Sequence, residues 1–252
     1  MRLRVLGCSG AEFPGHFSSA FLLDDTMLLD AGTIGAVLNA EEQWAIAAIL
    51  LTHRHLDHLK SLPLLADNII IRNLEHTVRV YGIRDTLEAL SSHLLNNSIW
   101  PDFSQLPTPE HPVIRYEEII TGSPFRVEGF EVSAFPVTHS VPAVGYIVRK
   151  QGKGILYTGD TGPTDLIWRM ATDLSAIIVE VSFPSDLEEL ALRTGHLTPR
   201  LLALELDKLA GRPGRILITH PKPQYFAAIT DELADLRIPE LELLREGDLY
   251  DF

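Results

Sequence analysis

The sequence predicts an α/β (or α+β) fold in which apolar strands form sheets and helices cover their outer faces. Two observations lead to this expectation. Strand-like apolar segments and helix-forming segments follow one another in both halves of the chain, and this mixture is typical of sheets covered by helices. The 252 residues also contain no tandem repeat, low-complexity tract or linker-like stretch. We therefore expect a single domain that spans residues 1–252.

The first half of the chain is expected to begin with strands joined by polar or glycine-rich turns. The segments SSAFLLDD and TMLLDAGT indicate a hairpin, because Asp24 and Asp25 make a polar turn between two apolar runs. Residues 34–48 have helical spacing, and residues 59–71 begin like a helix and end in a β-branched run. Further strands are expected at 3–7, 47–52 and 77–82, and a further helix at 84–97.

The second half opens with a proline-rich segment and then returns to strands and helices. Residues 100–112 hold four prolines, which predicts a surface loop. The helix expected at 198–211 starts with threonine and proline and ends in glycine. Strands are expected at 125–137, 144–150, 154–159, 175–183 and 215–220, and helices also at 164–172 and 231–238.

The charge of the chain is strongly negative. Lys and Arg number 21 against 34 Asp and Glu, which gives a net charge of −13. Such a surface repels long polyanions, so extended nucleic-acid binding is disfavoured. A small anion can still be captured where a metal ion dominates the local field. Much of the acidity lies near the C-terminus, where we interpret it as a solvated helical face.

Cysteine content and hydropathy favour a cytoplasmic protein. Cys8 is the one cysteine, so an internal disulfide is excluded. We expect Cys8 to pack rather than react, since nothing cationic neighbours it in sequence. No apolar run reaches the length of a membrane span, and the N-terminal MRLRVLGCSG has no apolar core long enough for a secretion signal.

A dense histidine cluster follows the apolar strand expected at 47–52. The segment THRHLDHL places His53, His55, Asp57 and His58 within six positions. His53 and His55 share one face of an extended backbone, and the next two side chains diverge on the turn. Imidazole with carboxylate suits zinc, and also manganese or iron. Solvated loop histidines are the alternative, but so dense a cluster favours a metal site that could serve two ions.

Three more candidate ligands lie at or just after strand-like runs. His139 follows AFPVT, Asp160 follows ILYTG, and His220 ends RILITH. Ligands at strand ends are held by a rigid scaffold and still face a cleft. An aspartate between two glycines is often only a turn former. Because five histidines need an anion between the metals, we favour Asp160 as a carboxylate held between two ions.

These residues resemble the pattern of the metallo-β-lactamase superfamily. Its HxHxDH segment is followed by a lone His, an Asp and a final His, in the order found here. Asp30, in LLDAGT, matches the early aspartate that supports the metal loop in that family. The resemblance implies a four-layer αββα sandwich with the site at one edge of its two sheets.

Within the superfamily, the sequence most resembles the class II 3′,5′-cyclic-nucleotide phosphodiesterases. Four stretches carry this likeness: HRHLDHLKSLP, YTGDTGPTDL, VEVSFP with GHLTPRLLALEL, and ITHPKP. Thr164 is inserted before Asp165 relative to the family pattern, and the proline-rich loop 100–112 matches none of its motifs. The resemblance implies hydrolysis of cyclic AMP or GMP to the 5′-monophosphate.

The resemblance also implies roles for the ligands. His53, His55 and His139 would hold one divalent ion, Asp57, His58 and His220 would hold the other, and Asp160 would bridge them. Zinc is the favoured ion, with manganese and iron as alternatives. A hydroxide between the metals would attack the phosphate, with Asp57 as ligand and orienting group.

The leaving alkoxide needs a proton, and His196 in GHLTP is the candidate general acid. It precedes a helix start that would favour a nearby phosphate. Glu180 is a candidate for orienting the His196 imidazole. The alternatives are an exposed pre-helix histidine and an ordinary strand-end carboxylate.

The remaining polar and aromatic candidates have weaker signals. Surface or anchoring roles are favoured for all of them over substrate contact. They are His16, His76, His93, His111, Trp100, Phe103 and Lys222.

The expected partner is a small-molecule cyclic nucleotide, with no long nucleic acid and no membrane. A homodimer is expected by analogy with the fold. A competing hypothesis is a transfer-RNA 3′-end endonuclease (ribonuclease Z-like), which the segment HSVPAVGY resembles. Against it stand the net charge and the lack of a glycine-rich basic insertion that would grip the tRNA. The metal-binding motif alone would also suit hydrolysis of a lactone or thioester. A non-catalytic sensor or scaffold with this fold is disfavoured, because none of the metal-binding residues of the family pattern is missing.

Overall fold

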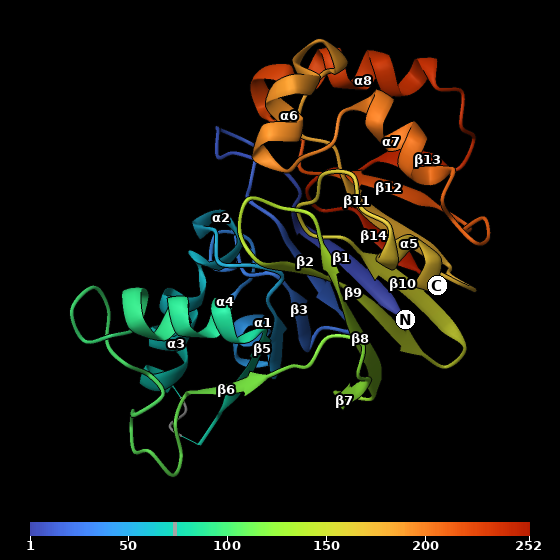
Figure 1. The fold of residues 1–252 in the computed structure, drawn as a ribbon. Helices are drawn as coiled ribbons and strands as arrows, with labels where there is room; N and C mark the ends of the chain where they lie inside the picture. Colours follow the sequence, from blue (N-terminus) through green and yellow to red (C-terminus); the bar gives the residue numbers. More distant parts are fainter. Residues whose placement is uncertain (73–74) are drawn as a thin grey trace.

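The computed structural model describes residues 1–72 and 75–252. Two seven-stranded mixed sheets lie face to face in it, and helices cover the outer side of each (Figure 1). The expected four-layer αββα arrangement is therefore confirmed. Among the described residues, none of the helices is both long enough and apolar enough to cross a membrane.

The first sheet comes mainly from the N-terminal half and has the order β14-β1-β2-β3-β4-β5-β6. Strands β3 to β6 pair in parallel, whereas β14, β1, β2 and β3 pair antiparallel. The strands are β1 (Arg2–Gly7), β2 (Ala20–Leu23), β3 (Met27–Leu29), β4 (Ala48–Leu50), β5 (Val78–Gly82), β6 (Ile114–Glu118) and β14 (Leu249–Asp251).

The second sheet has the order β13-β12-β11-β10-β9-β8-β7. Strands β10 to β13 pair in parallel, and β7 to β10 pair antiparallel. The strands are β7 (Phe125–Val127), β8 (Phe130–Val137), β9 (Ala143–Lys150), β10 (Lys153–Tyr157), β11 (Ala176–Glu180), β12 (Ile216–Thr219) and β13 (Leu241–Leu243).

Three apolar clusters hold the layers together. One lies between the sheets, where Phe21 of β2 meets Tyr157 of β10 edge to face. The others lie between each sheet and its helices. The helices are α1 (Ala40–Trp44), α2 (Leu56–Leu59), α3 (Leu62–Arg72), α4 (Arg84–Ala89), α5 (Leu166–Met170), α6 (Glu188–Thr194), α7 (Pro199–Leu206) and α8 (Phe226–Asp235), with a π-helical turn at Leu90–Leu94 and 3-10 turns at Ser185–Leu187 and Pro223–Tyr225.

Several expected elements differ in the structure. The helix expected at 34–48 is limited to α1, because Asn39 and Glu42 form a capping box that starts it at Ala40. The β-branched run at 69–71 is helical, since α3 buries Ile69 against the first sheet and turns Ile71 to solvent. Packing of an amphipathic helix thus overrides β propensity. Strand β6 and helix α6 were not expected.

The proline-rich loop 100–112 contains neither helix nor strand, as expected. Phe103 lies in the cluster between the first sheet and its helices, so it anchors this loop rather than contacting substrate. Cys8 is also buried, and this desolvation raises the pKa of its thiol. Its expected packing role is therefore confirmed.

Replacing Trp168 by alanine should destabilise the second helical layer. Trp168 is 0% exposed, and its Nε1–H donates to Glu205 Oε2 at 2.7 Å. The substitution leaves a cavity and removes a hydrogen bond from a buried carboxylate. We expect a loss of about 3–5 kcal/mol in the free energy of unfolding, measured by urea denaturation. The control is Leu204→Ala on α7, which is 57% exposed and should change stability by about 0.5 kcal/mol or less. A loss under about 1 kcal/mol for Trp168→Ala would contradict the packing described.

Candidate metal centre

The histidine cluster lies at the carboxyl end of β4. After this strand the chain continues outside helix and strand to His55, which has an extended backbone and occupies the N-cap position of α2 without a side-chain cap bond. The single turn of α2 then carries Asp57 and His58, while Leu56 points to solvent and is 61% exposed. A buried strand therefore delivers the ligand loop to the edge of the first sheet.

The second sheet brings three residues to the same place. His139, Asp160 and His220 follow the carboxyl ends of β8, β10 and β12. His220 has a φ of 66°, a left-handed backbone that is uncommon for a residue with a side chain. Its backbone N–H donates to Cys8 O at 2.6 Å, which holds it in this conformation. Such local strain is found at functional sites.

The predicted ligands form two adjoining groups that share Asp160. His53, His55, His139 and Asp160 make one group, and Asp57, His58, Asp160 and His220 make the other, with ligand atoms within 4.8 Å of one another in each. Asp160 Oδ2 lies 3.8 Å from His53 Nε2. Its Oδ1 lies 3.3 Å from His58 Nε2 and 3.4 Å from His220 Nε2. Each carboxylate oxygen thus faces a different group.

The unpaired atoms of these groups fit metal ions. Nε2 of His53, His58 and His220 and Oδ1 of Asp160 are buried and have no hydrogen-bond partner among the described residues. Buried polar atoms without a partner are costly and rare. Imidazole nitrogens and a carboxylate oxygen that converge in this way are a ligand set for divalent transition metals.

Asp30 supports the loop from beneath. This buried residue has a φ of 58° and places Oδ2 2.7 Å from His58 Nδ1. The Thr52 and Tyr157 hydroxyls each donate to the same oxygen at 2.8 Å. A carboxylate on Nδ1 fixes the tautomer that leaves Nε2 free to bind a metal. Asp30 was expected to support the loop, whereas the roles of Thr52 and Tyr157 were not.

Burial and neighbouring charges shift the pKa values of several proposed ligands toward the forms that bind metal. Burial alone would raise the pKa of Asp160 and of Asp57, but His220 and His58 hold both carboxyls well below their usual range. Burial lowers the pKa of His53 and of His55. These shifts favour ionised carboxylates and neutral imidazoles, the forms that bind metal. At His58 burial lowers the pKa, but the Asp160 and Asp30 carboxylates raise it by more, so an ion that binds there must displace a proton.

His196 lies beside both groups. Its ring stacks on His220 with centroids 5.6 Å apart, and it lies 5.1 Å from the ring of His139. His196 Nδ1 is 2.7 Å from Oε1 of the buried Glu180, at the end of β11. Burial lowers the pKa of His196, but the charge and hydrogen bond of Glu180 raise it by more, so the net shift is upward. The structure therefore brings together every residue predicted to ligate or to donate a proton.

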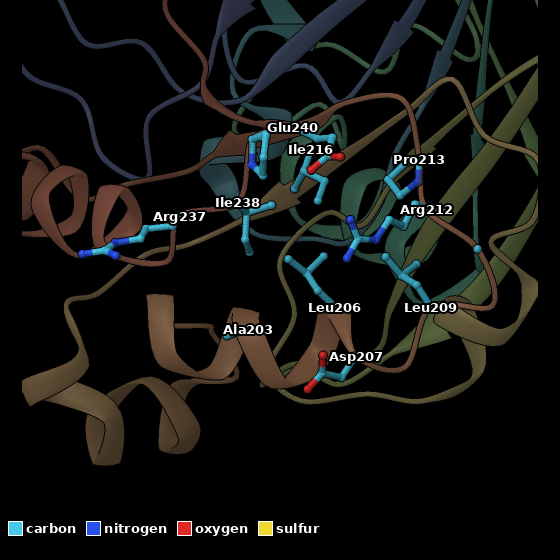
Figure 2. Close-up of a pocket in the computed structure, with 12 residues that line it drawn as sticks. Ala203, Leu206, Asp207, Leu209, Arg212, Pro213, Ile216, Arg237, Ile238 and Glu240 are labelled. Carbon is cyan, nitrogen blue, oxygen red and sulfur yellow. The ribbon is translucent and has the colours of Figure 1, made fainter.

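Two of the weaker candidates, His16 and Lys222, have partners outside the ligand groups. His16 Nδ1 lies 3.2 Å from Ser9 Oγ. Lys222 Nζ donates to Gly10 O at 2.7 Å and lies over the ring of Phe183. A cavity of about 490 Å³ lies elsewhere, between α7, the end of α8 and β12, and Figure 2 shows that charged side chains such as Arg212 and Asp207 line it together with apolar ones. It contains none of the predicted site residues.

Replacing Gly10 by alanine should disturb His220. A Cβ at Gly10 would lie 2.5 Å from His220 O and 2.7 Å from its Nδ1. We expect metal affinity at the group containing His220 to fall about tenfold or more, measured by competition with a chelator. Gly211→Ala is the control, because nothing lies within 4 Å of a Cβ there. Equal affinities in the two variants would contradict the contact.

The class of protein follows from the fold and site together with a family match. Residues 28–220 match the family model described as "Beta-lactamase superfamily domain". The chain belongs to the metallo-β-lactamase superfamily, as the sequence resemblance implied. With its His/Asp groups able to bind metal ions, it is a metal-dependent hydrolase of this fold.

One curated relative and two solved structures resemble this chain over nearly its whole length. A ribonuclease Z of Methanococcus maripaludis is 26% identical over 100% of this chain and 99% of its own length. The crystal structure of unliganded yeast PDE1 matches with a TM-score of 0.82 at 19% identity and covers 98% of both chains. Human tRNase Z, short form, matches with a TM-score of 0.74 at 22% identity, over 100% of this chain and 99% of that one. These two structures show the shared fold.

The expectation of a small-molecule partner and no long nucleic acid is wrong. Relatives matched over the whole chain carry the name ribonuclease Z. The net charge was a poor guide because it sums the whole surface, whereas binding depends on the field at the site. Asp57 and Asp160 count toward that sum, yet bound cations would reverse the local charge there. These relatives also do not support the narrower resemblance to cyclic-nucleotide phosphodiesterases, because they are named ribonuclease Z.

Proposed function

We propose that the protein is a dinuclear metal-dependent phosphodiesterase of the ribonuclease Z type, which cleaves RNA near its 3′ end. The observation that carries this proposal is Asp160, whose two oxygens face two separate groups of histidines. Such a geometry suits two neighbouring ions, an arrangement used for in-line displacement at phosphorus. The ribonuclease Z relatives, matched over the whole chain, support RNA as the substrate.

Seven residues would hold the ions, with zinc favoured and manganese or iron as alternatives. They are His53, His55 and His139 for the first, Asp57, His58 and His220 for the second, and Asp160 for both. When bound, two such ions lower the pKa of a shared water and neutralise charge on the phosphoryl oxygens. Asp57, whose side chain is partly exposed, also orients the attacking water.

His196 supplies the proton for the leaving ribose oxygen. It lies beside His139 and His220, so it borders both ligand groups. Glu180 holds its Nδ1 at 2.7 Å, which leaves Nε2 to donate. Burial lowers the pKa of His196, but the Glu180 carboxylate raises it above its ordinary value, which favours the protonated ring that a general acid requires.

A cyclic nucleotide is the competing substrate, and the activity assay must include it. The segments GDTGP, GHLTP and THPKP resemble those of cyclic-nucleotide phosphodiesterases, and the fold overlaps closely with that of yeast PDE1. The alignment with the Methanococcus ribonuclease Z runs over 321 positions against 252 residues here, a difference of 321 − 252 = 69. The relative therefore has segments without counterpart in this chain, and the KM for RNA must be measured along with the rate.

The test uses purified, metal-quantified protein with two substrates in separate reactions: a 3′-extended precursor tRNA and 3′,5′-cyclic AMP. We expect metal-dependent cleavage of the RNA that disappears in His55→Ala. The exposed His93→Ala is the matched control and should retain activity. Release of 5′-AMP with the RNA left intact would overturn the ribonuclease proposal. Turnover of neither substrate, with two ions bound, would overturn it as well.

A further inference from the structure

Ser182 lies at the junction of the ligand groups and the proton donor. This residue is fully buried and follows β11, and the sequence predicted no role for it. Its Oγ lies 2.9 Å from His220 Nδ1 and 3.1 Å from His196 Nδ1. The same hydroxyl donates to Glu180 Oε2 at 2.9 Å. One side chain thus contacts a candidate metal ligand, the candidate general acid and the carboxylate that holds that acid.

The direction of the hydrogen bonds follows from the geometry of His220. Its Nε2 faces Asp57 Oδ2 at 3.5 Å and Asp160 Oδ1 at 3.4 Å, and it is the nitrogen without a partner. A neutral imidazole that ligates through Nε2 carries its hydrogen on Nδ1 and needs an acceptor there. Ser182 Oγ is in position to accept. The serine hydrogen then points to Glu180, as its donated bond requires.

The other side of the site repeats this arrangement. There, Asp30 holds His58 directly at 2.7 Å and reaches His53 through a hydroxyl. The hydroxyl is that of Thr52, which donates to Asp30 at 2.8 Å and lies 3.0 Å from His53 Nδ1. In each half a buried carboxylate therefore holds one histidine directly and a second through a hydroxyl. The repetition indicates that Ser182 sets the orientation of a ligand rather than merely filling space.

We propose that Ser182 is a positioning residue that fixes His220 with Nε2 toward the shared ligand groups and links this ligand to the carboxylate that holds His196. The proposal rests on the proposed function, since it concerns the same site. Glu180 then orients two side chains, because its Oε1 accepts a hydrogen bond from His196 and its Oε2 accepts one from Ser182. Loss of the hydroxyl leaves the buried Nδ1–H of His220 without an acceptor and frees the ring to turn.

The test is a zinc titration of metal-free protein in competition with a chelator, which needs no substrate. For Ser182→Ala we expect binding of one ion, at the group containing His220, to weaken about 10–100-fold while the other ion binds as in the wild type. Ser182→Thr restores a hydroxyl and should recover the affinity. Should the alanine variant not fold, Ser182→Cys carries the same expectation, because a thiol is a weaker partner at similar size.

Ser9→Ala is the matched control. Ser9 Oγ lies 3.2 Å from His16 Nδ1 and donates to Glu246 at 3.1 Å, so it has the same kinds of partner outside the ligand groups. This variant should bind both ions normally. Equal weakening of both ions in Ser182→Ala, or weakening equal to that of Ser9→Ala, would indicate only a structural role and overturn the proposal.

Nitrogen-15 histidine spectra of zinc-loaded protein give a second readout. In the wild type the Nδ1–H of His220 should be protected from exchange, and in Ser182→Ala it should exchange rapidly or change tautomer. Unchanged zinc binding and an unchanged His220 signal would overturn the role of Ser182. A wild type that binds two ions but cleaves no RNA would instead overturn the proposed function, so the two failures are distinguishable.

Discussion

Asp160→Ala is expected to reduce metal binding from two ions to at most one and to lower kcat/KM about 10³-fold or more. The reason is that both ligand groups include this side chain, with Oδ2 on the side of His53 and Oδ1 on the side of His58 and His220. Its removal also leaves buried histidines without the anion between them. The measurement is metal content by elemental analysis, together with rates on the 3′-extended RNA.

The control for this variant is Asp165→Ala. Asp165 lies five positions away, and its exposed side chain pairs with Lys208 at 2.9 Å. It should keep both ions and full activity. Two ions retained in Asp160→Ala would contradict the bridging role, whatever happened to the rate.

His196→Ala should lower kcat about 10²–10⁴-fold and leave metal content unchanged. His196 is absent from both groups that share Asp160, yet it lies beside His139 and His220. The effect should appear mainly in kcat, because proton donation is needed in the transition state rather than for binding. The control is His76→Ala, since His76 bonds to Ile46 O at 2.7 Å, away from the ligands. Loss of metal in His196→Ala, or an unchanged kcat, would contradict the assignment.

The pH profile of Glu180→Gln tests the same proton donor. A general acid must be protonated, so the rate falls as the pH rises through the pKa of His196. Burial lowers that pKa and the Glu180 carboxylate raises it above its ordinary value. Removing the charge should therefore move the alkaline limb of the kcat profile to lower pH. An unmoved limb would show that Glu180 does not set the protonation of His196.

That the proposed ligands lie together could be predicted from sequence, because most of them are close together in the chain or follow apolar strands. His53 to His58 crowd into one loop, and His139, Asp160 and His220 each follow an apolar strand. Strand ends are places where a scaffold presents side chains to a cleft.

Asp30 was predicted to support the metal loop, but the hydroxyl groups that orient the ligands together with it and with Glu180 could not be predicted. Tyr157 donates to Asp30 across 127 positions, and Ser182 meets His220 across 38. A serine or tyrosine in a strand-like run has no spacing that marks such a contact. The Tyr157 contact forms only when the two sheets face each other, and the Ser182 contact forms only when β11 and β12 pair within the second sheet.

Local sequence patterns also gave the wrong secondary structure where tertiary packing determines whether a segment is a helix or a strand. Residues 69–71 favour a strand by composition, yet they end helix α3 because one face of it packs on the first sheet. Strand β6 alternates buried and exposed positions weakly and follows the proline-rich loop, so its pairing with β5 was not evident. The net charge misled for a similar reason, since a sum over the chain carries no information about position.

The number of zinc ions bound per chain tests the two-ion centre most directly. It is measured by elemental analysis of wild-type and Asp160→Ala protein after saturation with zinc and removal of free metal. The geometry of Asp160 predicts two ions in the wild type and at most one in the variant. A wild type that holds a single ion, or a variant that holds as many ions as the wild type, would contradict a centre bridged by this carboxylate.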